Sequence, residues 1–363
     1  MVKDERGSTA AGNGRPPGRS GTITLRDVAN ETHVSITTVS RILNGRASGV
    51  PIREDTRQRV VDAAAALGYT PNLLARALRG SRSSLLGVIA RDVTDPFHIQ
   101  VLRGINDAAQ LAGYRLFLGH VDYRPETAIA YGSMFERSHA DGIVVVGDIE
   151  GGEDLVDALA QQHRYIVGVT DRTHRRAIPG VYVDSVAGTR LAIDHLLALG
   201  HRRIACVTDE VTADGRARAA EYERLLRDQR AADAIAVHTV ANPGTPEPAY
   251  RLGQLVFGSS DEQPPTAIYA TSDTIAIGLM QAAFEAGLTV PGNVSIVGYD
   301  DIDLAGYVIP PLTTVSQSGV EMGRRAAELL LRMIAEDLDR ATVDDIVIEP
   351  RLVVRGSTAP PRA

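Results

Sequence analysis

The sequence predicts an α/β protein in which an N-terminal three-helix, helix-turn-helix unit precedes a two-lobed core. Residues 22–67 show helical periodicity interrupted by turns. From Ser84 onward, short apolar strand candidates alternate with amphipathic helix candidates. This alternation requires mostly parallel sheets covered by helices. It continues for about 270 residues, which is more than one doubly wound sheet usually needs, so two lobes are expected.

Charge is distributed unevenly along the chain. The first 82 of its 363 residues contain 13 Lys and Arg against 7 Asp and Glu, whereas the remainder contains 25 against 38. A basic unit joined to an acidic body is expected when one end of a protein meets phosphate groups. A basic, solvated segment without a nucleic-acid partner would give the same counts.

Composition and motif content argue against several classes of protein. Cys206 is the one cysteine, so no intramolecular disulfide can form, and Met1–Ser20 lacks the apolar stretch of a secretory signal. No apolar run is long enough to span a bilayer. A cytoplasmic protein without a membrane partner is therefore expected. No dinucleotide fingerprint, metal-ligand cluster or nucleophile–base pair stands out, so we expect no enzyme activity, metal or cofactor.

The N-terminal unit has the pattern of a helix-turn-helix. After a polar arm at residues 1–21, Thr24 can cap a first helix that carries Asp27 in its first turn. Residues 32–34 make the turn, and Ser35 caps a second helix from Ile36 to about Leu43. A third helix, about Glu54 to Leu67, would close the core.

The second helix has a buried stripe and an outward face. The stripe consists of Val34, Val39 and Ile42. The outward residues are Ile36, Thr37, Ser40 and Arg41. The third helix would contribute Val60, Val61, Ala64 and Leu67 to the core. Short polar side chains with an arginine near a helix start suit a helix that enters the major groove. An ordinary three-helix domain is the alternative.

The core region alternates strands and helices. The strand candidates are Leu85–Ala90, Arg115–Leu118, Ile143–Val146, Tyr165–Val169, Ile204–Thr208, Ala267–Ala270 and Val294–Tyr299. The helix candidates include Ile99–Ala112, Val186–Leu199, Asp273–Ala286 and Val320–Ala335. Glycines stand where helices should end, at Gly113, Gly200 and Gly287.

Polar residues follow the strand candidates, where ligands bind in open α/β sheets. They are found in Asp92–His98, Gly119–His120, Gly147–Asp148, Thr170–Asp171, Thr271–Asp273 and Tyr299–Asp301. These side chains suit hydrogen bonds to hydroxyl groups, and Phe97 and Tyr299 suit contact with an apolar ring face. Helix capping is the alternative role for Ser272 and Asp273. Capping explains Asp300 less well, because no convincing helix begins after Asp301.

Thr24–Asn44, continued by Leu67–Leu78, resembles the DNA-binding end of the LacI/GalR family. The resemblance implies that residues 71–83 form a hinge helix and linker, with Leu78 wedging into the central base step of an operator. The predicted DNA-binding residues are Thr24, Ile36, Thr37, Thr38, Ser40, Arg41, Asn44, Asn72, Ala75 and Leu78. Two departures are His33, where the family often has glycine, and the longer loop Gly45–Arg53.

The resemblance extends through the core. It rests on the segments Asp95–His98, Gly188–Ile204, Ser272–Gly278, Val297–Asp301 and Ile309–Thr314. It implies a periplasmic-binding-protein-like fold over residues 84–356, with chain crossings near Asp184, Thr314 and Arg340. One lobe would then comprise 84–184 and 315–340, the other 185–314 and 341–356. Residues 22–70 would be the DNA-binding domain, and 357–363 a tail.

The resemblance also implies a set of effector-binding residues. They are Phe97, His98, Asp171, Arg218, Tyr222, Ser272, Asp300 and Gln317. Arg218 and Asp300 would hold sugar hydroxyls, because a guanidinium and a carboxylate offer complementary donors and acceptors to a diol. Tyr222 would stack on the sugar ring. A surface arginine is the alternative for Arg218, and Ser272 replaces the asparagine common in the family.

The resemblance implies a sequence-specific transcriptional regulator, in most relatives a repressor. A small, sugar-like effector would control its affinity for palindromic double-stranded DNA. A homodimer is expected because one recognition helix covers only a half-site, with helices around Ile99–Ala112 at the interface. A solute-binding protein with the same core fold, or a regulator that needs a nucleobase or nucleoside as corepressor, remains the alternative.

Overall fold

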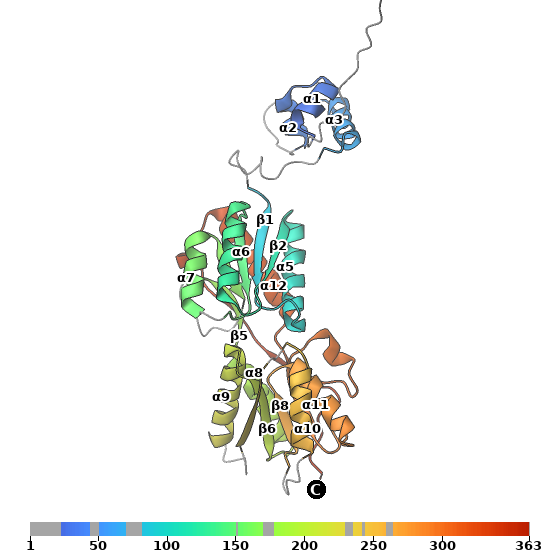
Figure 1. The fold of residues 1–363 in the computed structure, drawn as a ribbon, viewed down its shortest axis with the longest axis vertical. Helices are drawn as coiled ribbons and strands as arrows, with labels where there is room; N and C mark the ends of the chain where they lie inside the picture. The colour runs from blue at the N-terminus through green and yellow to red at the C-terminus, as the bar shows by residue number, and fades with distance from the viewer. Residues whose placement is uncertain are drawn as a thin grey trace, which may run out of the picture. The chain divides into compact units, whose positions relative to one another are not determined.

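The computed structural model describes residues 23–43, 51–69, 82–149, 152–169, 178–228, 235–241, 244–258 and 264–362. The chain divides into two units, Met1–Arg76 and Ala77–Ala363 (Figure 1). No helix in the described ranges combines the length and the apolar character needed to cross a bilayer.

The first unit contains α1 (Leu25–Thr32), α2 (Ile36–Leu43) and α3 (Glu54–Ala66). Its buried core consists of Val28, Ala29, Val39, Ile42, Val60 and Ala64. The prediction that Val61 belongs to this core is wrong, because its side chain is 43% exposed. Val60 and Ala64 stand one turn apart and occupy the inward face of α3, so the next residue points outward.

Local hydrogen bonds fix the starts of α1 and α2. The backbone N–H and the hydroxyl of Thr24 donate to Asp27 Oδ2 over 2.8 and 2.7 Å, which lowers the pKa of Asp27. The amide of Thr38 donates to Ser35 Oγ over 3.2 Å, the predicted cap of α2. His33 ends α1 with φ +52°, the left-handed conformation that glycine adopts most easily.

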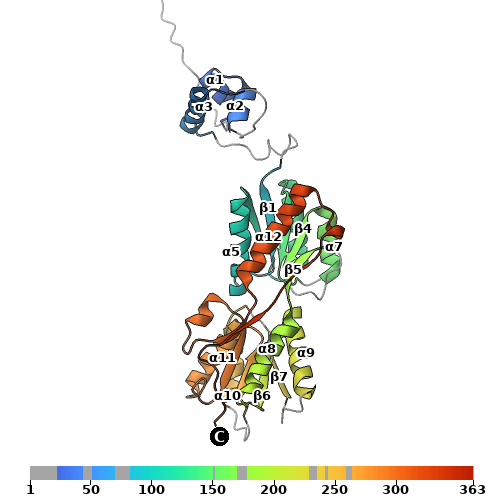
Figure 2. The same ribbon diagram turned by 180° about the vertical axis from the view of Figure 1, so that it is seen from behind.

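The described part of the second unit contains two six-stranded sheets. The order of the first sheet is β11 (Ile346–Ile348), β5 (Gly180–Val183), β4 (Ile166–Val169), β3 (Gly142–Val146), β1 (Leu85–Ala90) and β2 (Arg115–His120). All of its strand pairs are parallel. Helices α5 (Pro96–Leu111) and α12 (Gly319–Glu336) pack on one face, as Figure 2 shows, and α6 (Pro125–Arg137) and α7 (Gly152–Gln162) on the other. We call this layered unit the N-lobe.

The second sheet forms the C-lobe. Its order is β12 (Arg351–Val353), β10 (Thr313–Ser316), β9 (Ser295–Asp300), β8 (Ala267–Ala270), β6 (Ile204–Asp209) and β7 (Ile235–Val240). Only β12 runs antiparallel to its neighbour among these strands. Helices α8 (Ser185–Ala198) and α9 (Ala213–Asp228) cover one face, and α10 (Glu247–Phe257) and α11 (Asp273–Glu285) the other. Two short 3-10 turns, η2 (Asp303–Gly306) and η3 (Arg340–Thr342), complete the described elements.

The chain passes between the lobes at three places. The first is Asp184, whose carboxylate accepts a hydrogen bond from Ala187 N at the start of α8. The second lies at residues 317–318, slightly beyond the predicted Thr314, because β10 continues to Ser316. The third lies at residues 349–350, so the prediction near Arg340 is wrong. Strand β11 pairs with β5 and keeps residues up to Ile348 in the N-lobe.

The first residues of the predicted tail, from Ser357, belong to the C-lobe. Ser357 is fully buried; its hydroxyl donates to Ile296 O over 2.6 Å and accepts from Thr313 N over 2.8 Å. Ser357 also pairs with β9 through its backbone, because the amide of Ile296 donates to Ser357 O. The boundary at residue 357 is therefore wrong for these first residues.

Two glycines let α5 and α12 approach closely in the N-lobe. A Cβ on Gly104 would overlap the carbonyl oxygen of Val320, and a Cβ on Gly323 would overlap that of Val101. The obstructing atoms are helix backbone, which cannot rotate away as a side chain can. These glycines set the distance between two helices that cover one face of the sheet.

Candidate ligand cleft and recognition helix

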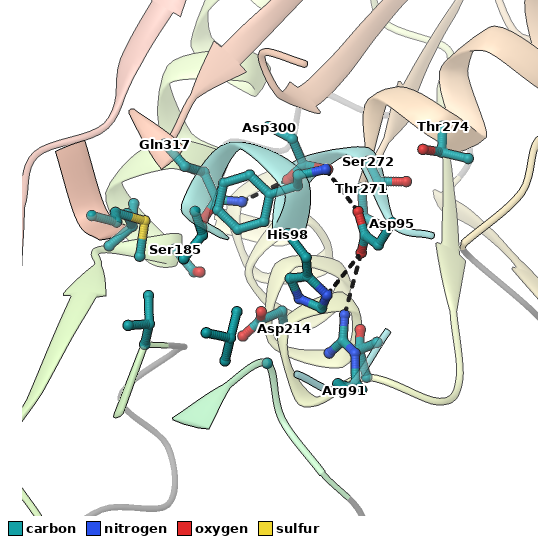
Figure 3. A pocket seen from close by; sticks show the side chains of 18 of the residues that line it. Arg91, Asp95, His98, Ser185, Asp214, Thr271, Ser272, Thr274, Asp300 and Gln317 are labelled. Atoms are coloured by element: carbon teal, nitrogen blue, oxygen red, sulfur yellow. Dashed lines mark hydrogen bonds and ion pairs between the residues drawn. The ribbon is translucent and has the colours of Figure 1, made fainter. Parts of the chain in front are cut away.

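A pocket lies between the two lobes and is lined from both (Figure 3). The N-lobe contributes Arg91, Asp95, Phe97 and His98 from the end of β1 and the start of α5. The C-lobe contributes Asp209, Asp214, Arg218, Thr271, Ser272 and Asp300. Ser185 begins α8 directly after the first crossing, and Gln317 lies at the second crossing. The pocket thus stands where carboxyl ends of strands in the two sheets meet, as expected for an α/β ligand site.

Six of the eight predicted effector-binding residues line this pocket. They are Phe97, His98, Arg218, Ser272, Asp300 and Gln317. Asp171 lies outside the described residues. Ser272 also caps α11, because its Oγ accepts from Ile275 N over 3.2 Å, so the capping alternative holds beside its place in the lining.

The predictions for Tyr222 and Tyr299 require correction. Tyr222 is fully buried, and its hydroxyl donates to Ile204 O over 2.5 Å, inside the apolar core of the C-lobe. It follows Arg218 by one helical turn on α9 but does not line the pocket. Tyr299 is also fully buried, with the Arg218 guanidinium carbon 3.7 Å from its ring centroid. Neither ring is presented to a ligand.

Arg218 and Asp300 form a buried pair at the C-lobe wall. Arg218 Nη1 lies 3.6 Å from Asp300 Oδ1 and donates to Thr271 O over 2.8 Å. Gln317 Nε2 donates to the same Asp300 oxygen over 2.6 Å. Burial raises the pKa of Asp300, and the charge of Arg218 opposes that rise. The surface-arginine alternative for Arg218 is wrong, because the residue is 4% exposed.

On the N-lobe wall, Asp95 lies between two nitrogen-bearing side chains. Its Oδ2 is 3.5 Å from Arg91 Nη2 and 3.9 Å from His98 Nδ1, while Oδ1 accepts from Phe97 N at the start of α5. His98 Nδ1 donates to Asp92 O over 2.8 Å. Burial lowers the pKa of His98. Gly147, with φ +87°, leaves room for both Arg91 and His98, which a Cβ there would meet at 2.7 and 2.9 Å.

Three charged residues of the lining were not predicted from the sequence: Arg91, Asp209 and Asp214. Arg91 directly follows β1 and Asp209 ends β6, so inspection of every strand end would have found both. Asp214 lies in the first turn of α9, where a structural role at the helix N-terminus is the simpler expectation. Within the described part of the chain, Arg91 Nε and Nη1, Arg218 Nε and Asp214 Oδ1 are buried without a hydrogen-bond partner.

Asp273 is fully buried outside the cleft lining. Its Oδ2 accepts from Ile302 N over 2.9 Å, and its Oδ1 accepts from the Thr314 hydroxyl. Burial raises its pKa to about 7; the two hydrogen bonds and Arg355 oppose the rise, and Asp301 adds to it. The neighbouring Asp300 is a further carboxyl that faces this group.

This raised pKa predicts a pH-dependent contribution to stability. Because the folded state binds this proton more tightly than the unfolded state, the contribution is present below the ordinary value of 3.8 and is lost as pH rises to about 7. Asp273→Asn keeps an acceptor for Ile302 and a donor for Thr314 but cannot ionise. The Tm of Asp273→Asn relative to wild type should therefore increase between about pH 5 and about pH 7.5. A Tm difference that stays constant over this range would contradict the prediction.

The candidate DNA-contacting residues of the first unit lie at the surface of α2. Ile36 is 40% exposed, Thr37 is exposed, and Thr38, Ser40 and Arg41 are partly exposed. Thr24 is exposed at the start of α1. The remaining predicted contacts lie outside the described residues: Asn44, Asn72, Ala75 and Leu78.

Comparison with known proteins identifies the family. The model for bacterial regulatory proteins of the lacI family matches residues 24–72, and the model for the periplasmic binding protein-like domain matches residues 193–358. The HTH-type transcriptional regulator DegA of Bacillus subtilis (strain 168) is 32% identical over 344 residues, which cover 93% of this chain and 98% of DegA. The chain belongs to the LacI family.

Solved structures agree with this assignment. The Lac repressor dimer bound to operator and the anti-inducer ONPF has a TM-score of 0.81 and 26% identity, covering 93% of this chain and all of that one. A LacI family regulator from Enterococcus faecium with bound ribose has a TM-score of 0.68 and 28% identity, covering 77% of this chain and all of that one. The predicted family, fold class and function as a transcriptional regulator are confirmed.

Proposed function

We propose that this LacI-family regulator binds palindromic operator DNA as a homodimer, and that a neutral, polyhydroxylated ligand in the cleft changes its operator affinity. One observation carries the ligand assignment: both lobes direct buried, partly unsatisfied charged groups into one pocket. Buried hydrogen-bonding groups are rarely left without partners. A ligand that bridges the lobes would supply them and would favour the closed arrangement.

The balance of donors, acceptors and charge defines the ligand class. The unpartnered N–H groups of Arg91 and Arg218 require acceptors, whereas Asp214 Oδ1 requires a donor. A hydroxyl group can provide either. The lining holds four aspartates and two arginines, so its electrostatic balance opposes an anionic ligand. The relative from Enterococcus faecium with bound ribose supports a sugar.

A panel of compounds tests the ligand class. Thermal unfolding is measured with D-ribose, D-glucose and D-galactose, with D-glucuronate and glucose 6-phosphate as anionic counterparts, and with adenosine for the nucleoside alternative. Binding to the folded state alone raises Tm. We expect stabilisation by at least one neutral sugar. Stabilisation confined to the anions or to adenosine would overturn the proposed ligand class.

The outward face of α2 carries the proposed base recognition. Arg41→Ala should weaken binding to the specific operator by about 1–3 kcal/mol and relax base preference at one position, if Arg41 contacts a base edge. The control is Arg57→Ala on α3, which removes the same charge from an exposed side chain ion-paired with Glu54. Competition between specific and random duplexes measures the effect. Equal weakening on both duplexes would assign Arg41 to phosphate contact instead.

The dimer is proposed from symmetry. A single recognition helix covers a half-site, so a palindrome requires two copies of the chain. Exposed apolar side chains on and near α5, including Ile99 and Leu111, offer a surface for a second copy. Sedimentation should give twice the mass of one chain.

A further inference from the structure

The turn that follows β9 has an unusual backbone. Asp300 has φ +115° and Asp301 has φ +58°, so two consecutive residues with side chains adopt positive φ. Such conformations are uncommon for residues other than glycine and persist only where the surrounding structure holds them. The turn matters because it directs the Asp300 carboxyl into the cleft and leaves Asp301 outside the lining.

Asp273 holds one side of this turn from the start of α11. Its carboxyl accepts a hydrogen bond from the amide of Ile302, the first residue after the turn, and another from Thr314 on β10. It also packs against β9 before the turn, since a Cβ on Gly298 would overlap Asp273 Oδ1. One buried carboxyl therefore connects the strand before the turn, the residue after it and the neighbouring strand.

Arg355 holds the other side from the segment after β12. Its Nη2 lies 2.6 Å from Asp301 Oδ1, and its Nη1 donates to Leu312 O over 2.8 Å. Gln100 of the N-lobe donates to Asp301 O over 3.0 Å, so the turn is also contacted from across the cleft. Neither Asp273 nor Arg355 lines the pocket.

We propose that Asp273 and Arg355 are positioning residues that brace the Asp300–Asp301 turn and thereby hold the Asp300 carboxyl against Gln317 and the ligand. The inference rests on the proposed function, which assigns the ligand contact to Asp300. Removing either brace frees the strained backbone to relax toward ordinary φ values. The Asp300 carboxyl then leaves its position even though its own side chain is unchanged.

The first test needs no ligand. Amide hydrogen exchange and crystal structures are compared for wild type, Asp273→Ala, Asp273→Asn and Arg355→Ala, with Arg351→Ala on β12 as an exposed arginine control. Losing these hydrogen bonds should speed exchange in residues 298–306 by about tenfold in Asp273→Ala and Arg355→Ala. The crystal structures should show Asp300 displaced from Gln317. Asp273→Asn and Arg351→Ala should match wild type in both measurements. Because Arg355 is partly exposed, its variant tests the proposal even if Asp273→Ala does not fold.

The second test measures affinity for the neutral sugar that stabilises wild type. Asp273→Ala and Arg355→Ala should bind it about tenfold more weakly, while Asp273→Asn restores wild-type affinity. An unmoved Asp300, or faster exchange throughout the C-lobe, would overturn the proposal, because the latter indicates general destabilisation. If wild type binds no sugar but the turn responds as expected, the proposed ligand class fails and the bracing stands.

Discussion

Replacing Arg218 with alanine is expected to weaken ligand binding in the cleft strongly. The substitution removes a buried guanidinium that pairs with Asp300, contacts Thr271 O and stacks on the Tyr299 ring. It also removes the N–H at Nε that lacks a partner in the described structure. Truncating one member of a buried charge pair at a binding site costs about 2–5 kcal/mol, which weakens binding about 30-fold or more.

Arg216→Ala is the matched control for this prediction. Arg216 stands two residues earlier on α9, is exposed, and donates to the carbonyl oxygens of Glu210 and Val211 outside the cleft. Titration calorimetry with the neutral sugar should show wild-type affinity for Arg216→Ala and strongly reduced affinity for Arg218→Ala. Operator affinity without ligand should be retained in both. Wild-type sugar affinity in Arg218→Ala would remove this residue from the site.

Gly323→Val should severely destabilise the N-lobe. Any Cβ at this position overlaps the carbonyl oxygen of Val101, so α12 must move away from α5. Separation would open the apolar cluster that both helices bury against the sheet. Overpacking commonly lowers the free energy of unfolding by about 1–3 kcal/mol. Because the obstructing atom here is backbone, we expect Gly323→Val to lower it by about 3 kcal/mol or more.

Glu328→Val introduces the same side chain at an exposed position of the same helix, where it loses one surface ion pair with Arg324. This substitution should lower the free energy of unfolding by less than about 1 kcal/mol, because surface ion pairs contribute little to stability. Chemical unfolding of the two variants measures the difference. Similar stabilities would mean that the helices can separate at no cost and that the close crossing is not required.

The fold was largely predictable because its longer elements carry strong periodic signals. Strands β1 and β8 have the predicted bounds, and α5, α8, α11 and α12 lie within a few residues of the expected ranges. The strands β5, β10, β11 and β12, of three or four residues, were missed, and so was the six-residue β7, although the four-residue β4 and β8 were predicted. Such segments are defined by their sheet partners rather than by their own pattern. This is why the third lobe crossing was misplaced.

The site was predictable where residues stand at strand ends or matched family motifs, as Asp300 and Gln317 do. Tyr222 shows the limit of spacing arguments. Tyr222 lies four residues after Arg218, so both side chains are on the same face of α9. This spacing does not indicate that Arg218 reaches the cleft while Tyr222 packs in the core. The positive φ values at Asp300 and Asp301, and the bracing by Asp273, depend on tertiary contacts that no local pattern encodes.

We expect ligand occupancy of the cleft to control DNA binding. The most direct test is the operator dissociation constant, measured by fluorescence anisotropy with and without the sugar that binds wild type. The operator duplex is first recovered by selection from random DNA. Reciprocal coupling between two sites typically changes affinity about 5- to 150-fold. We predict a change in this range for wild type and none for Arg218→Ala. An unchanged operator dissociation constant while the sugar occupies the cleft would contradict this prediction.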